Sequence, residues 1–287
     1  MKKDNLISII IPTYKRVIKL KKALNSILKQ KYDNWEAIVI DNKSNDGTKE
    51  LVKEYNDKIF FYEIENNGII AKSRNFGISK AKGNYLAFLD SDDWWERDKL
   101  EKTNYYINKG YNFLYHDMYV VKNNTIFKKK TSYCRHLKKK IYEDLINNGP
   151  AFPTSSVVIN KELFNNIENF DEDPRLVTWE DYDAWIRFSK INENFFKVPG
   201  ALGCIKIGDD NALNADKLRD NIHNFNLKYI KENKMPEWCI FSLLRLSVIK
   251  KDFLKAKQYF NDLNFFDLSF SNKIRFLVFK IFVFLKI

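Results

Sequence analysis

The chain has 287 residues, of which 45% are hydrophobic and 30% charged, and its net charge is +12. This composition supports a packed interior, excludes a chain dominated by disorder, and with a mean hydropathy of -0.46 argues against an integral membrane protein. The apolar runs fall short of the roughly 18 to 20 residues that span a bilayer, and three widely spaced cysteines provide neither a disulfide framework nor a zinc pattern.

The first hundred residues alternate two patterns. Continuous apolar runs predict buried strands in LISIIIP, EAIVIDN, KIFFYEI and NYLAFLD. Helical periodicity separates them, and the first helix would carry its apolar stripe on Ile18, Leu20, Ala23, Leu24, Ile27 and Leu28. Strands that alternate with helices in this way predict an α/β fold, with a mostly parallel sheet and helices on both of its faces.

Polar side chains follow three of these strands. Pro12, Thr13 and Tyr14 end the first strand, Asp41 ends the second and Asp90 ends the fourth. In open α/β sheets, ligands bind outside the carboxyl ends of the strands. We therefore expect these residues to line one crevice.

From about residue 111 the pattern loosens. NFLYHDMYVV and NTIFKKK suggest a hairpin, and TSSVVIN suggests a further strand. WEDYDAWIRFSKI predicts an amphipathic helix with Tyr182, Trp185, Ile186 and Ser189 turned inward. After about residue 212 the pattern is helical.

The turn DSDD, residues 90–93, is rich in carboxylates. Asp93 and Glu96 have the spacing of a capping box for a helix that begins near Trp94. Asp90 and Asp92 remain, and two carboxylates on a tight turn can present oxygens to one Mg²⁺ or Mn²⁺ ion, whose other sites substrate phosphates fill. Helix capping and turn formation alone would also explain these residues.

Four segments together resemble the family 2 glycosyltransferases, which are inverting enzymes with a GT-A fold. They are SIIIPTYKR, IVIDNKSNDGT, NNGIIAKSRNFGISKAKGNYLAFLDSDD and WEDYDAWIR, in the order and spacing of that family. The resemblance implies a GT-A catalytic domain at 1–212, with a nucleotide-sugar-binding half at 1–110 and an acceptor-binding half at 111–212. Residues 213–287 would form a helical C-terminal extension.

The resemblance also implies a UDP-sugar donor. Asp41 would recognise the uracil ring, because a carboxylate accepts the imide N–H. Asp46, Gly47 and Thr48 instead suit the start of the next helix. The residues implied to bind the nucleotide sugar are Pro12, Thr13, Tyr14, Arg16, Asp41, Lys72, Arg74, Asp90 and Ser91.

Two acidic motifs would carry the chemistry. Asp92, with Asp90, resembles the motif that binds Mn²⁺ or Mg²⁺, which neutralises the departing diphosphate. Asp181 resembles the general base that takes the proton of the acceptor hydroxyl, with Glu180 as the second candidate. Asp183 should point elsewhere on the helix and be solvated.

The acceptor side is defined less closely. Trp94, Trp95 and Trp179 flank the acidic motifs, where they would either stack on sugars or pack in the core. Thr154 and Ser155 resemble hydrogen-bonding residues below the acceptor.

One segment departs from the family pattern. Residues 203–214 lack the histidine that many members carry there. Lys206, Asp209 and Asp210 are nearby, and Lys206 is an alternative contact for the diphosphate. The third metal ligand is therefore not assigned.

Basic charge gathers in two segments. Residues 122–140 carry eight Lys or Arg and no acid, and 217–287 carry 14 basic against 6 acidic residues. The tail, 272–287, predicts a basic amphipathic helix that lies on an anionic membrane surface, or one that packs on the domain or on a homodimer partner. These segments could also be solvated lysine-rich faces.

We expect a hexosyltransferase that moves glucose, galactose or N-acetylhexosamine from a UDP-sugar to a glycan acceptor. The acceptor would be a lipid-linked oligosaccharide, lipopolysaccharide core or capsule precursor, and the enzyme would be cytoplasmic, at the inner membrane. The alternatives are a basic nucleic-acid- or membrane-binding module and a catalytically inactive relative. We expect no nucleic-acid partner, because no recognition motif accompanies the basic segments.

Overall fold

The computed structural model describes two compact units, residues 1–138 with 151–211 and residues 139–150 with 212–287. The described residues are 4–55, 57–122, 125–131, 134–207, 215–231, 234–265, 268 and 270–285. Asp209 and Asp210, and part of the basic segment 122–140, lie outside them. The predicted boundary near residue 212, and the division at 110, stay predictions.

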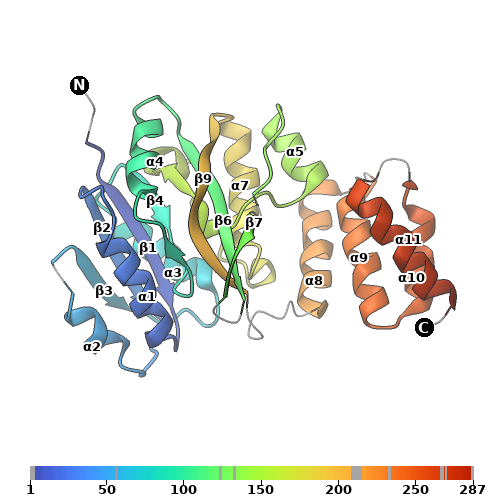
Figure 1. Ribbon diagram of the computed structural model, residues 1–287, viewed down its shortest axis with the longest axis horizontal. Coiled ribbons are helices and arrows are strands. Elements are labelled where there is room, and N and C mark those ends of the chain that lie inside the picture. The colour runs from blue at the N-terminus through green and yellow to red at the C-terminus, as the bar shows by residue number, and fades with distance from the viewer. Residues whose placement is uncertain are drawn as a thin grey trace. The chain divides into compact units, whose positions relative to one another are not determined.

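In the first unit, strands and helices alternate as far as β4 (Figure 1). These elements are β1 (Ile7–Thr13), α1 (Val17–Leu28), β2 (Trp35–Asp41), α2 (Thr48–Lys53), β3 (Ile59–Glu63), α3 (Ile70–Lys80) and β4 (Tyr85–Phe88). The rest of the unit comprises β5 (Trp94–Trp95), α4 (Lys99–Ile107), β6 (Phe113–Lys122), β7 (Thr125–Thr131), a 3-10 turn (Thr154–Ser156), β8 (Val158–Asn160), α6 (Lys161–Asn165), a second 3-10 turn (Pro174–Leu176), α7 (Glu180–Ile191) and β9 (Phe195–Ile207).

The described strands form one mixed sheet in the order β3-β2-β1-β4-β8-β6-β9-β5, with β7 paired to β6. The first four strands are parallel, as is the pair β6 and β9, whereas β8, β5 and β7 run antiparallel to their neighbours. The α/β class and the predicted hairpin are confirmed. Parallel pairing is confined to fewer strands than a mostly parallel sheet would have.

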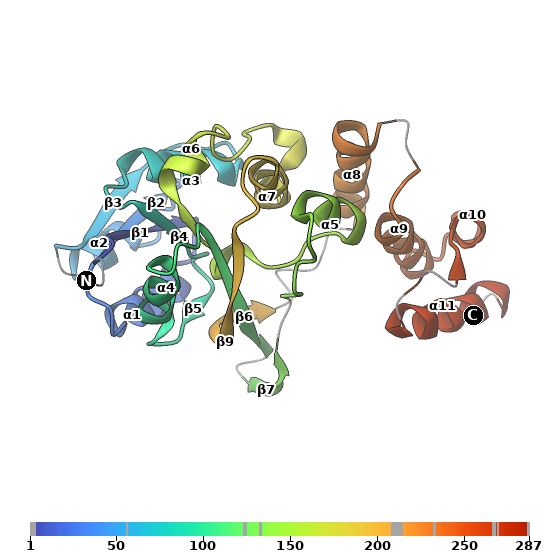
Figure 2. The same ribbon diagram turned by 90° about the horizontal axis from the view of Figure 1, so that it is seen from above.

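Alternating side chains of β1 divide the core into two layers. Ile7, Ile9 and Ile11 pack with α1 and α2 on one face, and Ile10 faces α3 on the other. Figure 2 shows the sheet between α1 and α4 on one side and α3, α6 and α7 on the other. A Cβ on Gly77 of α3 would lie 2.6 Å from the Ile40 side chain, so α3 approaches the sheet as closely as a backbone without a side chain can.

Two local predictions are wrong, and one strand was missed. Ile18 is 85% exposed and Leu28 is also exposed, so the buried stripe of α1 is narrower than predicted. No helix begins near Trp94, because Trp94 and Trp95 pair with β9, and α4 begins only at Lys99. Strand β9 was not predicted, because Pro199 and Gly200 interrupt its apolar pattern.

The second unit is helical in its described residues. It contains α5 (Ile141–Asn148), α8 (Ala215–Phe225), a π-helical turn (Asn226–Ile230), α9 (Glu237–Ile249), α10 (Phe253–Asp262) and α11 (Phe270–Leu285). Its core joins α9, α10 and α11 through residues that include Leu244, Phe260, Phe276 and Val283. Within the described part of the chain, no helix is both long and apolar enough to cross a membrane.

Candidate active site

The carboxyl ends of β1, β2 and β4 meet at one edge, as predicted. Thr13 pairs with Asp41 in the register of β1 and β2, and Leu89 donates its backbone N–H to the carbonyl of Ile10 at 3.1 Å. The chain then turns at DSDD, where the N–H of Asp93 donates to the carbonyl of Asp90 at 3.0 Å. The turn thus projects its carboxylates beside the end of β1.

Arg74 joins this turn to the second acidic motif. One guanidinium nitrogen lies 2.8 Å from Asp90 Oδ1 and the other 2.5 Å from Glu180 Oε1, and Arg74 is only 3% exposed. Burial would lower the pKa of Arg74, but the charges of Asp90, Glu180 and Asp181 outweigh burial and raise it. A permanently charged arginine therefore holds together motifs that are 90 residues apart in the chain.

The two carboxylates at the start of α7 differ in their surroundings. Glu180 is 4% exposed and is bound to Arg74, and burial raises its pKa. Asp181 is more exposed than Glu180, accepts the hydroxyl hydrogen of Thr154, and accepts the N–H of Tyr182 at 2.6 Å. Burial raises the pKa of Asp181, against the opposing effects of Arg74 and Thr154. Asp181 is thus the better placed of the two to reach a substrate.

Asp183 is not solvated, so that prediction is wrong. Its carboxylate is 2% exposed and lies 2.7 Å from Nε of Arg187, one helical turn later. Arg187 also donates to the carbonyls of Ile167 and Asn169. The pair fastens α7 to the preceding loop.

Asp92 has a more accessible arginine partner. Arg16, which is 38% exposed, approaches Asp92 Oδ2 to 2.8 Å. Burial and the neighbouring charge of Asp90 raise the pKa of Asp92, while Arg16 and Lys19 oppose the rise. Asp93 is buried and accepts the N–H of Lys206 at 3.3 Å, so its structural role is to hold β9 rather than to cap a helix.

A hollow of about 230 Å³ opens beside Arg16. Five predicted nucleotide-sugar residues line it: Pro12, Thr13, Tyr14, Arg16 and Ser91. Sequence reasoning missed Asn42, Asn66, Gly68, Ile70 and Ser73, which complete its lining. Of these, Asn42 directly follows Asp41 at a strand end, and this position could have identified it.

Other predicted donor residues lie outside this lining. Asp41 is 2% exposed and accepts hydrogen bonds from the N–H of Ser44, at 2.9 Å, and from its hydroxyl. Burial raises the pKa of Asp41. Lys72 is half-buried on α3. Asp46 accepts from the N–H of Thr48 at 3.1 Å, which confirms its predicted place at the start of α2.

The acceptor candidates divide by burial. Trp95 is 3% exposed, and its ring N–H donates to the carbonyl of Ser155 at 2.8 Å. Ser155 is fully buried, and its hydroxyl accepts the N–H of Asp90 at 3.0 Å. Both support the DSDD turn, as the core-packing alternative for Trp95 implies, and their contact with an acceptor stays a prediction. Trp94 and Trp179 are half-buried, and Thr154 contacts Asp181.

The residues predicted to hold a metal ion are Asp90 and Asp92. Among the residues that the structure describes, no group of three or more His, Cys, Asp or Glu side chains is arranged to hold a metal ion. The pairs with Arg74 and Arg16 engage Asp90 Oδ1 and Asp92 Oδ2, and each carboxylate has a second oxygen outside these pairs. Carboxylate oxygens suit Mg²⁺ and Mn²⁺ when phosphates complete the shell, so the residues present fit such an ion.

Comparison with known proteins identifies the family. Residues 8–167 match the family described as glycosyl transferase family 2. The UDP-Glc:alpha-D-GlcNAc-diphosphoundecaprenol beta-1,3-glucosyltransferase WfgD of Escherichia coli is 33% identical over 191 residues, which cover 66% of this chain and 72% of WfgD. The chain belongs to glycosyl transferase family 2. Two other curated glycosyltransferases are matched over only 40% and 61% of their own length.

Solved structures share the fold. S. aureus TarS 1-349 in complex with UDP-GlcNAc has a TM-score of 0.62 at 18% identity, over 96% of this chain and 81% of that one. The mannosyltransferase PcManGT from Pyrobaculum calidifontis, in complex with GDP-Man and Mn²⁺, has a TM-score of 0.61 at 16% identity, over 97% and 80%. The fold is therefore that of the GT-A glycosyltransferases, as the resemblance predicted.

Proposed function

We propose that this glycosyltransferase is an inverting, metal-dependent hexosyltransferase that moves glucose, galactose or an N-acetylhexosamine from a UDP-sugar to a hydroxyl of a glycan. The observation that carries the proposal is the contact of Arg74 with both Asp90 and Glu180, because a donor motif at the DSDD turn and a base at the start of α7 would have to act side by side. We assign donor binding to residues 1–110, acceptor binding to 111–212 and a helical extension to 213–287.

The donor would lie along the edge formed by Pro12, Thr13, Tyr14, Arg16 and Ser91. Arg16 can bind diphosphate oxygens, to which a guanidinium donates paired hydrogen bonds. Asp90 and Asp92 would hold Mn²⁺ or Mg²⁺, which neutralises charge on the leaving diphosphate. The named donor of WfgD and the ligand of TarS favour UDP, and the ligand of PcManGT makes GDP the comparison nucleotide.

Asp181 would act as the base. It would accept the proton of the acceptor hydroxyl as that oxygen bonds to the anomeric carbon, while the bond from this carbon to the diphosphate breaks on the opposite face. The configuration at the carbon is inverted as a result. Glu180 is held by Arg74 and would keep the arginine in place rather than take the proton.

The acceptor would be a lipid-linked oligosaccharide, with a lipopolysaccharide core or a capsule precursor as related candidates. The name of WfgD specifies a diphosphoundecaprenol acceptor, which supports the lipid-linked class. Trp94 and Trp179 are half-buried, with Lys22 over the ring of Trp94 and Tyr182 against Trp179, and they would contact a sugar through the ring surface that remains. Thr154 would orient Asp181.

Calorimetric titration of UDP, with and without Mn²⁺, tests the nucleotide and metal assignments. We expect metal-dependent binding that Asp92→Ala abolishes and that Asp33→Ala, an exposed control on the same unit, retains. Binding of GDP in place of UDP would correct the donor. No binding of either nucleotide would overturn the proposal.

We further propose that α11 attaches the protein to the cytoplasmic face of the inner membrane. Four exposed apolar residues follow the spacing of one helical face: Ile274, Leu277, Val278 and Ile281, which are 51, 50, 43 and 57% exposed. Phe276 and Val283 pack in the core of the second unit instead. Lys273, Arg275 and Lys280 accompany the exposed face, as in helices that lie on anionic lipid.

Cosedimentation with phosphatidylglycerol vesicles tests this attachment. The double variant Leu277→Asp with Ile281→Asp should lose binding, whereas Leu254→Asp, at a residue of α10 that is 80% exposed, should retain it. Equal vesicle binding by the parent protein, the double variant and Leu254→Asp would exclude membrane attachment through this face of α11. If light scattering shows that the parent protein is a dimer and the double variant a monomer, the exposed face of α11 would instead bind a second copy of the chain.

A further inference from the structure

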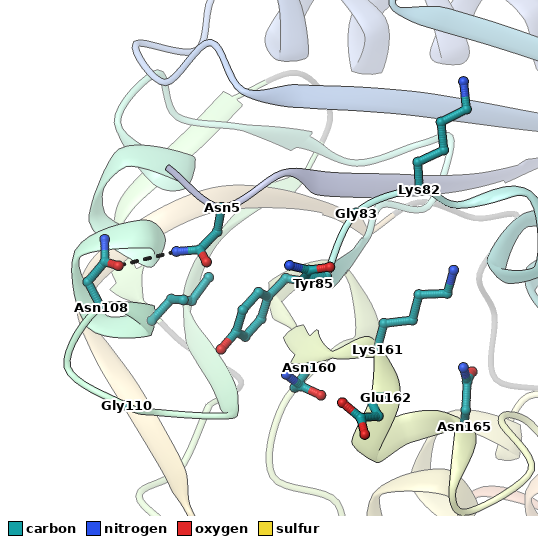
Figure 3. A pocket seen from close by; sticks show the side chains of 12 residues that line it. Asn5, Lys82, Gly83, Tyr85, Asn108, Gly110, Asn160, Lys161, Glu162 and Asn165 are labelled. Carbon is teal, nitrogen blue, oxygen red and sulfur yellow. Dashed lines mark hydrogen bonds between the residues drawn. The ribbon is translucent and has the colours of Figure 1, made fainter. Parts of the chain in front are cut away.

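A polar hollow of about 770 Å³ lies at the edge of the sheet away from the acidic motifs (Figure 3). It is lined where β1 and β4 begin, where β8 ends, and by the end of α4 and the first turn of α6. Tyr85 begins β4 and Asp90 follows its end, and five residues of extended chain span roughly 17 Å. The hollow is therefore separate from the donor site.

The lining is rich in amides. Five asparagines contribute to it: Asn5, Asn84, Asn108, Asn160 and Asn165. Figure 3 shows the ring of Tyr85 among them; Tyr85 is only 8% exposed, and its hydroxyl interacts with Asn160. Amides and hydroxyls both donate and accept hydrogen bonds, which matches a ligand with many hydroxyl groups.

A second hollow, of about 630 Å³, adjoins the first and shares Asn108 with it. Its lining includes Tyr32, Tyr105, Tyr106 and Pro199, and Tyr105 is 47% exposed. Aromatic rings offer apolar faces beside a polar tip. The first hollow thus provides hydrogen-bonding groups, and the second provides flat apolar surface.

The boundary between the hollows is preformed. Nδ2 of the buried Asn5 donates to Oδ1 of Asn104 at 2.9 Å and to Oδ1 of Asn108 at 3.3 Å, and these two residues lie on successive turns at the end of α4. On the floor, a Cβ at Gly83 would fall 2.5 Å from the carbonyl oxygen of Leu6. A fixed lining needs little ordering when a ligand binds.

The charges favour a neutral ligand. The lining residues include three lysines, Lys82, Lys161 and Lys102, and two carboxylates, Glu162 and Glu101, which is a difference of about one positive charge in a chain of +12. Lys102 is also paired with Asp98 at 2.6 Å. Lys161 donates to the carbonyl of Ala81, which commits part of its hydrogen-bonding capacity. An anion site would gather arginines or lysines without nearby carboxylates.

We infer that the two hollows form a non-catalytic binding site for an uncharged oligosaccharide. The amide-lined hollow would bind sugar hydroxyls, and the tyrosine-lined hollow would contact the apolar faces of the rings. Each volume lies within the usual range of ligand sites, about 300–1,000 Å³. The inference rests on the proposed function only in treating the growing glycan as the natural ligand.

Saturation-transfer NMR on the full chain tests the inference without any donor. The probes are the tetramers of glucose and of N-acetylglucosamine, with inorganic phosphate as a competitor. We expect saturation-transfer signals from at least one tetramer, and phosphate should not reduce them. Tyr105→Ala and Asn165→Ala should each weaken the affinity for that tetramer about fivefold. Ile18→Ala, an exposed change on α1, is the control.

The outcomes separate this site from the catalytic one. Asp92→Ala should abolish UDP binding and leave oligosaccharide binding intact. If UDP binding fails in the parent protein while a tetramer still binds at Tyr105, the proposed function falls and this inference stands. The inference is overturned if neither tetramer binds, if phosphate displaces the tetramer, or if Tyr105→Ala and Asn165→Ala bind as the control does.

Discussion

Arg74 and Arg16 each pair with an acidic motif of the site, but at different depths. Arg74 is 3% exposed and contacts two carboxylates, whereas Arg16 is 38% exposed and contacts Asp92 alone. A buried charge that loses its partners cannot be compensated by water, while an exposed one is resolvated at little cost. Arg74 therefore belongs to the framework of the site, and Arg16 can exchange Asp92 for a ligand.

The largest expected effect is a loss of kcat on replacing Asp181, because Arg74 binds Glu180 and leaves Asp181 available as the base. Asp181→Asn should lower kcat by about 10²–10⁴-fold, because the amide cannot accept the proton, while UDP affinity stays unchanged. Glu180→Gln should change kcat much less and instead lower the thermal unfolding temperature. Steady-state kinetics and thermal unfolding measure both. The opposite result, with Glu180→Gln inactive, would assign the base to Glu180.

Removal of Arg74 tests the framework role. Arg74→Ala leaves Asp90 and Glu180 without their cation, so we expect a loss of about 3–5 kcal/mol in the free energy of unfolding. Arg74→Lys keeps the charge but cannot contact both carboxylates, so its free energy of unfolding should lie between those of the parent protein and Arg74→Ala. Denaturant unfolding of the three proteins checks the order. An Arg74→Ala protein as stable as the parent would contradict a buried bridge.

The raised pKa of Asp181 leads us to expect that kcat depends on pH. Its raised pKa means that the carboxylate is protonated at a higher pH than an ordinary aspartate, so kcat should fall as pH decreases through this raised value. The hydroxyl of Thr154 lowers the pKa of Asp181, so Thr154→Val should move the acid limb to higher pH, whereas Thr154→Ser should not. An acid limb that does not move in Thr154→Val would contradict the effect of this hydrogen bond on the pKa of Asp181.

The smallest stability effect is expected at Arg16. Arg16→Ala should change the free energy of unfolding by less than about 1 kcal/mol, because the pair with Asp92 is partly exposed. The same variant should weaken UDP binding about tenfold if Arg16 binds the diphosphate. Lys21→Ala, an exposed change on α1, serves as the control in both measurements. A large stability loss at Arg16 would remove the contrast with Arg74.

Local pattern was sufficient for much of the fold. Apolar runs predicted β1 to β4. Of these strands, β1, β2 and β4 are buried on both faces, whereas β3, at the end of the sheet, is only partly buried. The rule that strand ends meet at one edge correctly brought Thr13 beside Asp41. Periodicity also predicted that Tyr182 and Trp185 face inward on α7.

Long-range contacts explain what local pattern missed. Asp93 and Glu96 have the spacing of a helix start, but Trp94 and Trp95 between them pair with β9 and form a strand. Asp183 looked solvated because its partner, Arg187, is anchored by loop carbonyls that no helical pattern reveals. The contact of Arg74 with Glu180 could not be predicted from local spacing either, since Glu180 on α7 lies 106 residues further along the chain.

Gly77 has a consequence for how this site tolerates change. It lies one helical turn after Arg74, where a Cβ would come within 2.6 Å of Ile40 and 2.9 Å of Ile10. A larger residue requires either that the side chains of Ile40 and Ile10 give way or that α3 moves outward and carries Arg74 with it, away from Asp90 and Glu180. Position 77 touches neither acidic motif, yet its missing side chain lets α3 hold the arginine at the distance at which it contacts both.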